Sequence, residues 1–113
     1  MHADARKLLW DARRAAEQVA RFTRGRTFAD YQSDDLLRSA VERQLAIVGE
    51  ALSQLRQIDP VTAEAIPELG RIIGFRNVLV HAYTTVDNRI VWGIIETNVG
   101  PLMASLDALL APP

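Results

Sequence analysis

Residues 74–83 read Gly-Phe-Arg-Asn-Val-Leu-Val-His-Ala-Tyr, and the rest of the chain is organised around this stretch. Successive residues of an α-helix are rotated by about 100°, which places the polar side chains of the stretch on one face. That face carries Arg76, Asn77, His81 and Tyr83 around Val80. A permanent cation, a group that titrates near neutrality and a phenol on one face can together handle a phosphate group. The opposite face is apolar and is predicted to pack on the core: Ile72, Phe75, Val78, Leu79 and Ala82.

The segments before this stretch have helical patterns of their own. Apolar residues at spacings of three and four predict a first helix over residues 4–24. The same spacing predicts a second helix from Ser33, as its N-cap, to about residue 58. Residues 26–33 lie between the two helices and are expected to form a connector, in which one or both of Phe28 and Tyr31 close one end of the core.

Proline and glycine divide the second half of the chain. Asp59-Pro60 has the residue types of a helix start and predicts a short third helix. The helix of the central stretch follows over about residues 70–83. A last helix, capped by Thr85 or Asp87, is expected to kink or split at Gly100-Pro101, because proline removes one backbone hydrogen bond. The sequence therefore predicts one domain over residues 1–113, an all-α, up-and-down bundle of four or five helices.

The composition is that of an ordinary globular chain, with 49% hydrophobic and 24% charged residues and a net charge of −1. The absence of cysteine excludes disulfides, thiolate nucleophiles and cysteine-ligated metals. There is one usable histidine without converging carboxylates and no glycine-rich phosphate loop, so we expect no metal site and no cofactor. Without a long apolar run, we expect no signal peptide, no membrane span and a cytoplasmic location.

Basic residues concentrate near the N-terminus. Residues 1–26 hold seven basic and three acidic residues, and residues 27–113 hold six basic and eleven acidic residues. Two interpretations explain this equally well. The first helix either holds RNA phosphates near a site elsewhere or presents an ordinary solvated face.

Gly49 lies inside the predicted second helix, where glycine costs about 1 kcal/mol relative to alanine. A residue without a side chain lets another helix approach closely, and we expect that neighbour to be the helix of residues 70–83. Glu50 follows directly, and Arg43 precedes it by about two turns on the same face. One or both are expected to orient Arg76 or His81, although ordinary surface ion pairing explains these residue types equally well.

Residue types alone favour an ordinary surface histidine and a salt-bridged arginine over a catalytic pair. However, Arg76 is followed directly by Asn77, then by His81 and Tyr83, and this pattern resembles the signature of HEPN-domain ribonucleases, most closely their HepT branch. Residues 43–51, 72–77 and 86–92 are similar to further segments of the same family, in the same order. The resemblance runs along nearly the whole chain. It implies the HEPN type of helical bundle, assembled as a homodimer.

The resemblance also implies an activity, that of a metal-independent endoribonuclease toxin in a type VII toxin–antitoxin system. Its substrate would be RNA, and its antitoxin partner would be a cognate minimal nucleotidyltransferase. Cleavage by the neighbouring 2′-hydroxyl needs a base, an acid and positive charge at the phosphate. His81 would be the base or acid, and Arg76 would stabilise the phosphate. One chain offers one credible histidine, so two protomers would share a composite site at a two-fold axis, with Val80 and Ile73 as natural interface contacts.

Asn77 and Tyr83 each have several interpretations. Asn77 would hydrogen-bond across the dimer, orient His81 from one turn away, or make a structural helix–helix hydrogen bond. Tyr83 would stack on a base, bind a phosphate or cap the helix end. The resemblance implies instead that Tyr83 is the residue to which the nucleotidyltransferase attaches AMP. Bulk and negative charge beside Arg76 would then repel RNA and switch the enzyme off.

A different class of function uses the same residues. In this alternative, the chain is a non-catalytic partner or substrate-binding subunit of a nucleotidyltransferase, and Arg76 and His81 bind nucleotide phosphates. A third interpretation is a purely structural helical dimer. Cleavage of RNA separates the first function from the other two.

Overall fold

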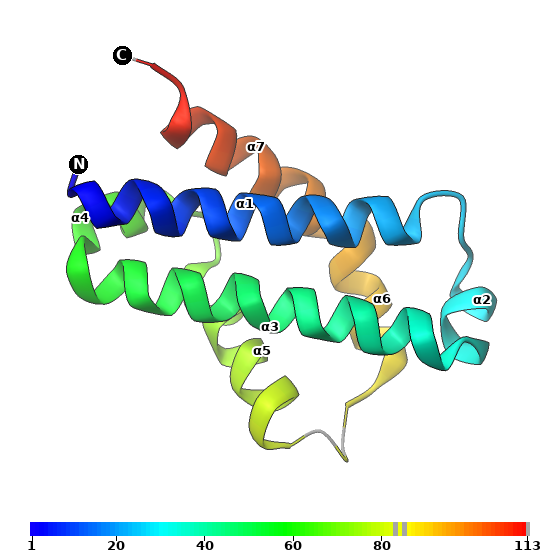
Figure 1. Ribbon diagram of the computed structural model, residues 1–113. Coiled ribbons are helices and arrows are strands. Elements are labelled where there is room, and N and C mark those ends of the chain that lie inside the picture. The colour runs from blue at the N-terminus through cyan, green and yellow to red at the C-terminus, as the bar shows by residue number, and fades with distance from the viewer. Residues whose placement is uncertain (83, 85, 113) are drawn as a thin grey trace.

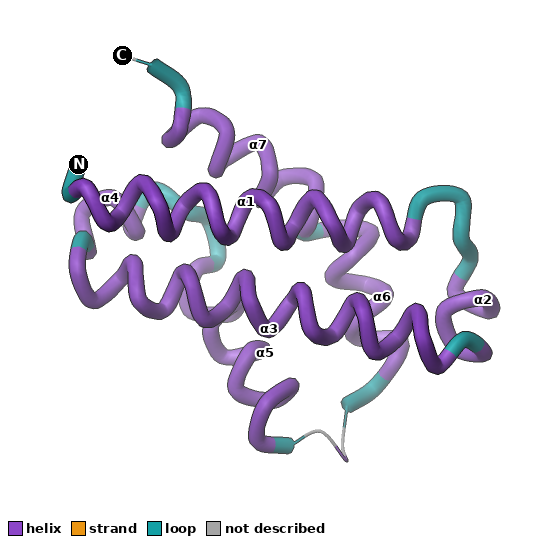
Figure 2. The backbone as a smooth tube through the Cα atoms, viewed as in Figure 1, coloured by secondary structure: helices purple, strands orange, loops and turns teal. Residues whose placement is uncertain are grey.

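A computed structural model describes residues 1–82, 84 and 86–112 of the chain. Within these residues the structure has seven α-helices and no strand, which confirms the predicted all-α fold class (Figure 2). The helices are α1 (Ala3–Thr23), α2 (Phe28–Ser33), α3 (Asp35–Ile58), α4 (Pro60–Glu64), α5 (Leu69–His81), α6 (Asn88–Thr97) and α7 (Val99–Leu110). No helix in this part of the chain is long and apolar enough to cross a membrane.

The two longest helices, α1 and α3, lie side by side and antiparallel (Figure 1). α5 packs against α3, and α7 packs against α1, so that the long pair forms the centre of the bundle. α2 and α6 meet near the end of α3 where that helix begins, and the short α4 lies at its other end (Figure 1). This arrangement carries α5, with the central stretch of the sequence, onto one side of α3.

The core is built from apolar side chains at helical spacing on the facing sides of these helices. α1 contributes mainly small residues together with the larger Leu9 and Val19; the small ones are Ala5, Ala12, Ala15 and Ala16. Small side chains let α3 approach α1 closely along its length. α3 contributes larger residues that are fully buried, namely Val41, Leu52 and Leu55. Each fully buried side chain of this size contributes roughly 1.5–3 kcal/mol to folding.

The segment between the two long helices corrects one sequence prediction. Residues 28–33 are helical rather than an irregular connector, and Ser33 ends α2 instead of capping the next helix. The reason is a capping box, in which the Thr27 hydroxyl accepts from the Asp30 backbone N–H and the Asp30 carboxylate accepts from the Thr27 N–H. Asp34 then takes the N-cap of α3, where its side chain accepts from the Leu37 N–H at 3.0 Å.

Aromatic side chains close this end of the core, as predicted. Tyr31 is fully buried, and its ring centroid lies 5.5 Å from that of Trp92 on α6. Phe28 is half-buried against the same tryptophan, at 6.5 Å between ring centroids. The contact joins α2 to α6 and fixes the start of α3.

Polar caps and proline set the helix limits in the second half of the chain. Asp59 caps α4 by accepting from the Thr62 N–H, with Pro60 at the first helical position, as predicted. Asp87 caps α6, and the alternative cap, Thr85, lies outside the described residues. The predicted split of the last helix occurs at Asn98, because Pro101 falls in the first turn of α7, where no backbone donor is needed.

Candidate functional site

α5 presents the central stretch, and its rotation differs from the predicted one at two residues. Leu79 is buried, as expected of the apolar face, whereas Val78 is 38% exposed. Ile73 was expected to be an interface contact and is instead buried in the core, with 6% exposure. The reason is that Arg76 is turned toward α3, so Ile73, one turn earlier on the same side, also faces α3. Val80 remains exposed at 44%.

Gly49 and Arg76 mark the closest approach between α3 and α5. A Cβ atom placed on Gly49 would lie 2.2 Å from the Cβ and 2.7 Å from the Cγ of Arg76. The neighbour that the sequence predicted for Gly49 is therefore confirmed as the helix carrying Arg76. The aliphatic part of the arginine occupies the space that any other residue at position 49 would fill.

The guanidinium group of Arg76 is held by two acceptors. Its Nη2 lies 2.5 Å from the Glu50 Oε2, and its Nη1 donates to the Asn77 Oδ1 at 3.0 Å. Its Nε is buried and has no acceptor among the described residues. The side chain as a whole is 25% exposed, and each Nη atom carries a second N–H group that these two acceptors leave available to an oxygen atom of a ligand.

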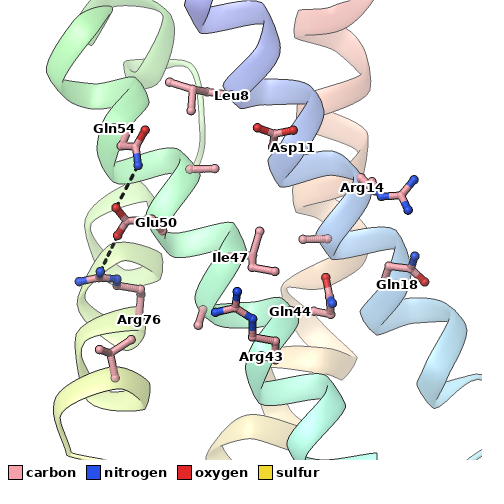
Figure 3. A pocket seen from close by; sticks show the side chains of 14 residues that line it. Leu8, Asp11, Arg14, Gln18, Arg43, Gln44, Ile47, Glu50, Gln54 and Arg76 are labelled. Atoms are coloured by element: carbon pink, nitrogen blue, oxygen red, sulfur yellow. Dashed lines mark hydrogen bonds and ion pairs between the residues drawn. The ribbon is translucent and has the colours of Figure 1, made fainter.

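Glu50 is the link between α3 and the arginine. Its second carboxylate oxygen, Oε1, accepts a hydrogen bond of 3.0 Å from the Gln54 Nε2, one turn further along α3. A hydrogen bond and an ion pair thus connect Gln54 through Glu50 to Arg76 (Figure 3). Sequence reasoning found Glu50 but missed Gln54, whose spacing of four residues after Glu50 on a helix was the available signal.

His81 is the last residue of α5 and is exposed. It lies roughly 7.5 Å further along the helix axis than Arg76, because five residues separate them. The imidazole makes no hydrogen bond or ion pair with any residue in the described part of the chain. One of the interpretations of Asn77, that it orients His81, finds no hydrogen bond between the two side chains among the described residues, where the Asn77 carboxamide oxygen accepts from Arg76.

A groove with a volume of about 620 Å³ opens beside Arg76 and is bordered by α1, α3 and α5. Glu50, Arg76 and Val80 line it at the α5 side, and Arg43 lines it two turns before Glu50 on α3 (Figure 3). The groove thus brings together the predicted Arg43, Glu50 and Arg76. His81 and Asn77 do not line it, and Tyr83 lies outside the described residues.

Chemically, one protomer offers a fixed cation with a free donor, an exposed imidazole and an open groove. Such a set can bind a phosphodiester and move one proton, while strand cleavage by a neighbouring hydroxyl requires a base and an acid. The family model described as ribonuclease HepT-like matches residues 12–109.

The chain belongs to the HepT-like ribonuclease family. A protein of Methanocaldococcus jannaschii whose name places it among the RNases is similar to this HepT-like chain, with 31% identity over 98 residues, 85% of this chain and 87% of that protein. A Thermococcus cleftensis protein whose name places it with ribonuclease HepT is 32% identical over 103 residues, 89% of this chain and 91% of that protein. No solved structure matches this HepT-like chain at a significant level. The family confirms the resemblance seen in the sequence, and its members are ribonucleases.

Proposed function

We propose that this HepT-like ribonuclease is a metal-independent endoribonuclease toxin that acts as a homodimer and is silenced by a nucleotidyltransferase antitoxin. The observation that carries the proposal is the state of Arg76. Its guanidinium is fixed by Glu50 and Asn77, yet the side chain remains 25% exposed at the groove, on the same helix as an exposed His81. A non-bridging oxygen of a phosphodiester would accept from the Nη N–H groups that Glu50 and Asn77 do not use.

The proposed reaction breaks one phosphodiester bond without a metal ion. The 2′-oxygen next to the scissile phosphate attacks phosphorus and the 5′-oxygen leaves, so that the products are a 2′,3′-cyclic phosphate and a 5′-hydroxyl. The proton of the 2′-hydroxyl passes to a base, and an acid protonates the departing 5′-oxygen. Arg76 offsets the negative charge that develops on the equatorial phosphate oxygens.

Two imidazoles supply the base and the acid more readily than one. Each protomer has one histidine on the helix of the central stretch, and we propose that a two-fold axis brings the two copies of His81 to a shared cleft. The exposed apolar Val80, beside the histidine, supports this placement of the interface. Asn77 is exposed at the same face, where its amide group would donate across the dimer.

Control by the antitoxin is the second part of the proposal. The nucleotidyltransferase would transfer AMP from ATP to the Tyr83 phenol oxygen and release pyrophosphate. Tyr83 follows His81 by two residues, so attached AMP groups would bring negative phosphate charge and bulk close to the cleft. Electrostatic repulsion and steric exclusion would then keep RNA away from Arg76.

The deciding experiment is cleavage of a labelled RNA by the purified protein in the presence of EDTA. We expect 2′,3′-cyclic phosphate ends from the wild type and loss of cleavage in His81→Ala and Arg76→Ala. Circular dichroism and the mass in solution of the His81→Ala protein serve as controls, since an exposed terminal helix residue should be dispensable for folding. Val61→Ala, at a residue that is 79% exposed on α4, is the matched surface control.

Three outcomes would contradict the proposal in different ways. Undiminished cleavage by His81→Ala would assign the activity to another site or a contaminant. Nucleotide binding without any cleavage would favour the alternative, a non-catalytic subunit of a nucleotidyltransferase. Intact-protein mass spectrometry after co-expression with the nucleotidyltransferase tests the control step separately, and an unmodified Tyr83 together with a silenced enzyme would exclude AMP transfer to this residue.

A further inference from the structure

We infer that the groove between α1 and α3 binds single-stranded RNA on one side of the scissile phosphate, with Arg43 and Arg14 contacting phosphates. The inference rests on the proposed function and extends it from the reacting phosphate to the path of the strand. Arg76 stands at one edge of the groove and Arg14 at the opposite edge, with Arg43 between them on α3 (Figure 3).

The charges of the groove are paired unevenly. Both carboxylates in its lining already have a cation, because Glu50 pairs with Arg76 at 2.5 Å and Asp11 pairs with Lys7 at 2.9 Å. Arg43 has no hydrogen-bond or ion-pair partner in the described part of the chain, and Arg14 contacts only an aromatic ring. The groove is therefore lined by two exposed guanidinium groups that form no ion pair within the described part of the chain. A polyanion is the complementary ligand.

The spacing of the cations fits a strand that begins at Arg76. Arg43 lies seven residues before Glu50 on α3, roughly 10 Å along the helix axis. A strand whose scissile phosphate lies at Arg76 and that follows the groove would carry one of its next phosphates to Arg43. Arg14 then lies across the groove on α1, where the strand would leave the protein surface.

Two further groups have the chemistry to contact bases. Gln18 lines the groove on α1, and its side-chain amide can hydrogen-bond a base. Trp10 is 54% exposed, and the Arg14 guanidinium lies 5.8 Å from its ring centroid. The ring does not line the groove itself but an adjoining hollow that Arg14 also lines, where the bases of a strand leaving the groove past Arg14 would stack on it. Together these groups favour RNA over a second copy of the chain as the occupant.

The test measures binding and cleavage separately. The binding probe is a fluorescein-labelled oligodeoxynucleotide, which lacks the 2′-hydroxyl and cannot be cleaved by the proposed reaction. We expect Arg43→Ala and Arg14→Ala each to raise Kd and the KM for RNA roughly tenfold while leaving kcat nearly unchanged, because both contacts persist from ground state to transition state. Trp10→Ala should raise Kd roughly fivefold or more.

Controls separate a phosphate contact from a structural role. Each lost arginine should reduce the slope of log binding constant against log salt concentration by about 0.7. Arg43→Lys should restore most of that slope, since a phosphate contact requires the charge. Arg56→Ala, an exposed arginine on the same helix but outside the groove, should leave Kd, KM and the salt slope unchanged.

The outcomes distinguish this inference from the proposed function. If the wild type cleaves RNA but Arg43→Ala and Arg14→Ala have unchanged KM and Kd, the proposed RNA-binding path is wrong and the proposed nuclease activity is supported. Binding that depends on both arginines without any cleavage supports the path and overturns the nuclease. A change in the mass of the assembly, instead of a change in Kd, would show that this face is a subunit contact and would overturn the path.

Discussion

Gly49 of α3 and Arg76 of α5 are in direct contact, and the arginine Cβ occupies the space that a Cβ atom at position 49 would need. The separation of 2.2 Å that a Cβ on Gly49 would have from the Cβ of Arg76 is far below any tolerated contact. The carboxylate of the next residue, Glu50, then reaches the guanidinium of the same arginine. One turn of α3 thus sets both the position and the charge partner of the proposed phosphate-binding group.

Gly49→Ala should therefore damage activity more than folding. The added methyl group forces α5 or the Arg76 side chain to move, and overpacking of this kind costs roughly 1–3 kcal/mol of stability. A displacement of the guanidinium by about 1 Å would lower kcat roughly 100-fold. Urea unfolding and RNA cleavage measure the two effects on the same preparation.

Gly74→Ala is the matched control for that substitution. Gly74 lies on α5 itself, and a Cβ there would meet nothing within 4 Å. Alanine should stabilise the helix by up to about 1 kcal/mol and leave kcat unchanged. Equal losses of activity in the two variants would show that the contact with Arg76 is not what matters.

Glu50→Gln should lower kcat roughly tenfold with little change in stability. The pair is only partly buried, with 45% of the Glu50 side chain exposed, so its loss should cost no more than about 1 kcal/mol. The amide retains a hydrogen bond but not the charge that orients Arg76. In an Arg76→Ala background, Glu50→Gln should have no further effect on cleavage, because the group that it orients is gone. Cleavage at the wild-type rate by the Glu50→Gln single variant would contradict an orienting role for the carboxylate.

Val80→Glu tests the proposed two-fold interface. Val80 is 44% exposed in the protomer, so the substitution should change the stability of the isolated fold by only about 0.5 kcal/mol. Two glutamates facing each other at a two-fold axis would repel, which should lower both dimer mass and cleavage. Sedimentation over a range of concentrations measures the mass, and Val61→Glu on α4 provides the control. A fully active monomer would contradict the shared site.

Tyr31→Phe should make the protein more stable. The Tyr31 hydroxyl is buried without a hydrogen-bond partner among the described residues, and burial raises the pKa of the phenol far above its ordinary value. Removal of the unsatisfied group should raise the free energy of unfolding by about 1 kcal/mol, as the ring contact with Trp92 is kept. Thermal unfolding at neutral pH checks this, and a lower Tm would show that an unseen partner satisfies the hydroxyl.

Glu42 should make stability depend on pH with an unusual sign. Burial raises the pKa of Glu42 above its ordinary value of 4.5, against an opposing effect of Arg38. The folded state therefore holds the proton more tightly than the unfolded state, and stability from this group is present below pH 4.5 and lost as pH rises through the folded pKa. Glu42→Gln should be more stable than wild type at pH 7, and the difference should shrink at pH 4.

The positions of most helices are predictable from the sequence, because they depend on the spacing of apolar residues and on caps formed by neighbouring residues. The cap formed by Asp59 with Pro60 and the interruption near Pro101 follow from backbone chemistry that neighbouring residues impose. The capping box of Thr27 and Asp30 is equally local, and it starts a short helix where apolar spacing alone predicts a connector. Gly49 was informative because a glycine inside a helix is unfavourable unless another element needs the space.

The sequence by itself determined the all-α fold, the helix that carries Arg76 and His81, and the close neighbour of Gly49. Only the tertiary structure decided the rotation of α5, which buries Ile73 and turns Arg76 toward Glu50. Only it revealed the groove that joins Arg76 to Arg43 and Arg14. The physical reason is that helical periodicity fixes which residues share a face, whereas the direction in which that face points depends on side chains from helices distant in sequence.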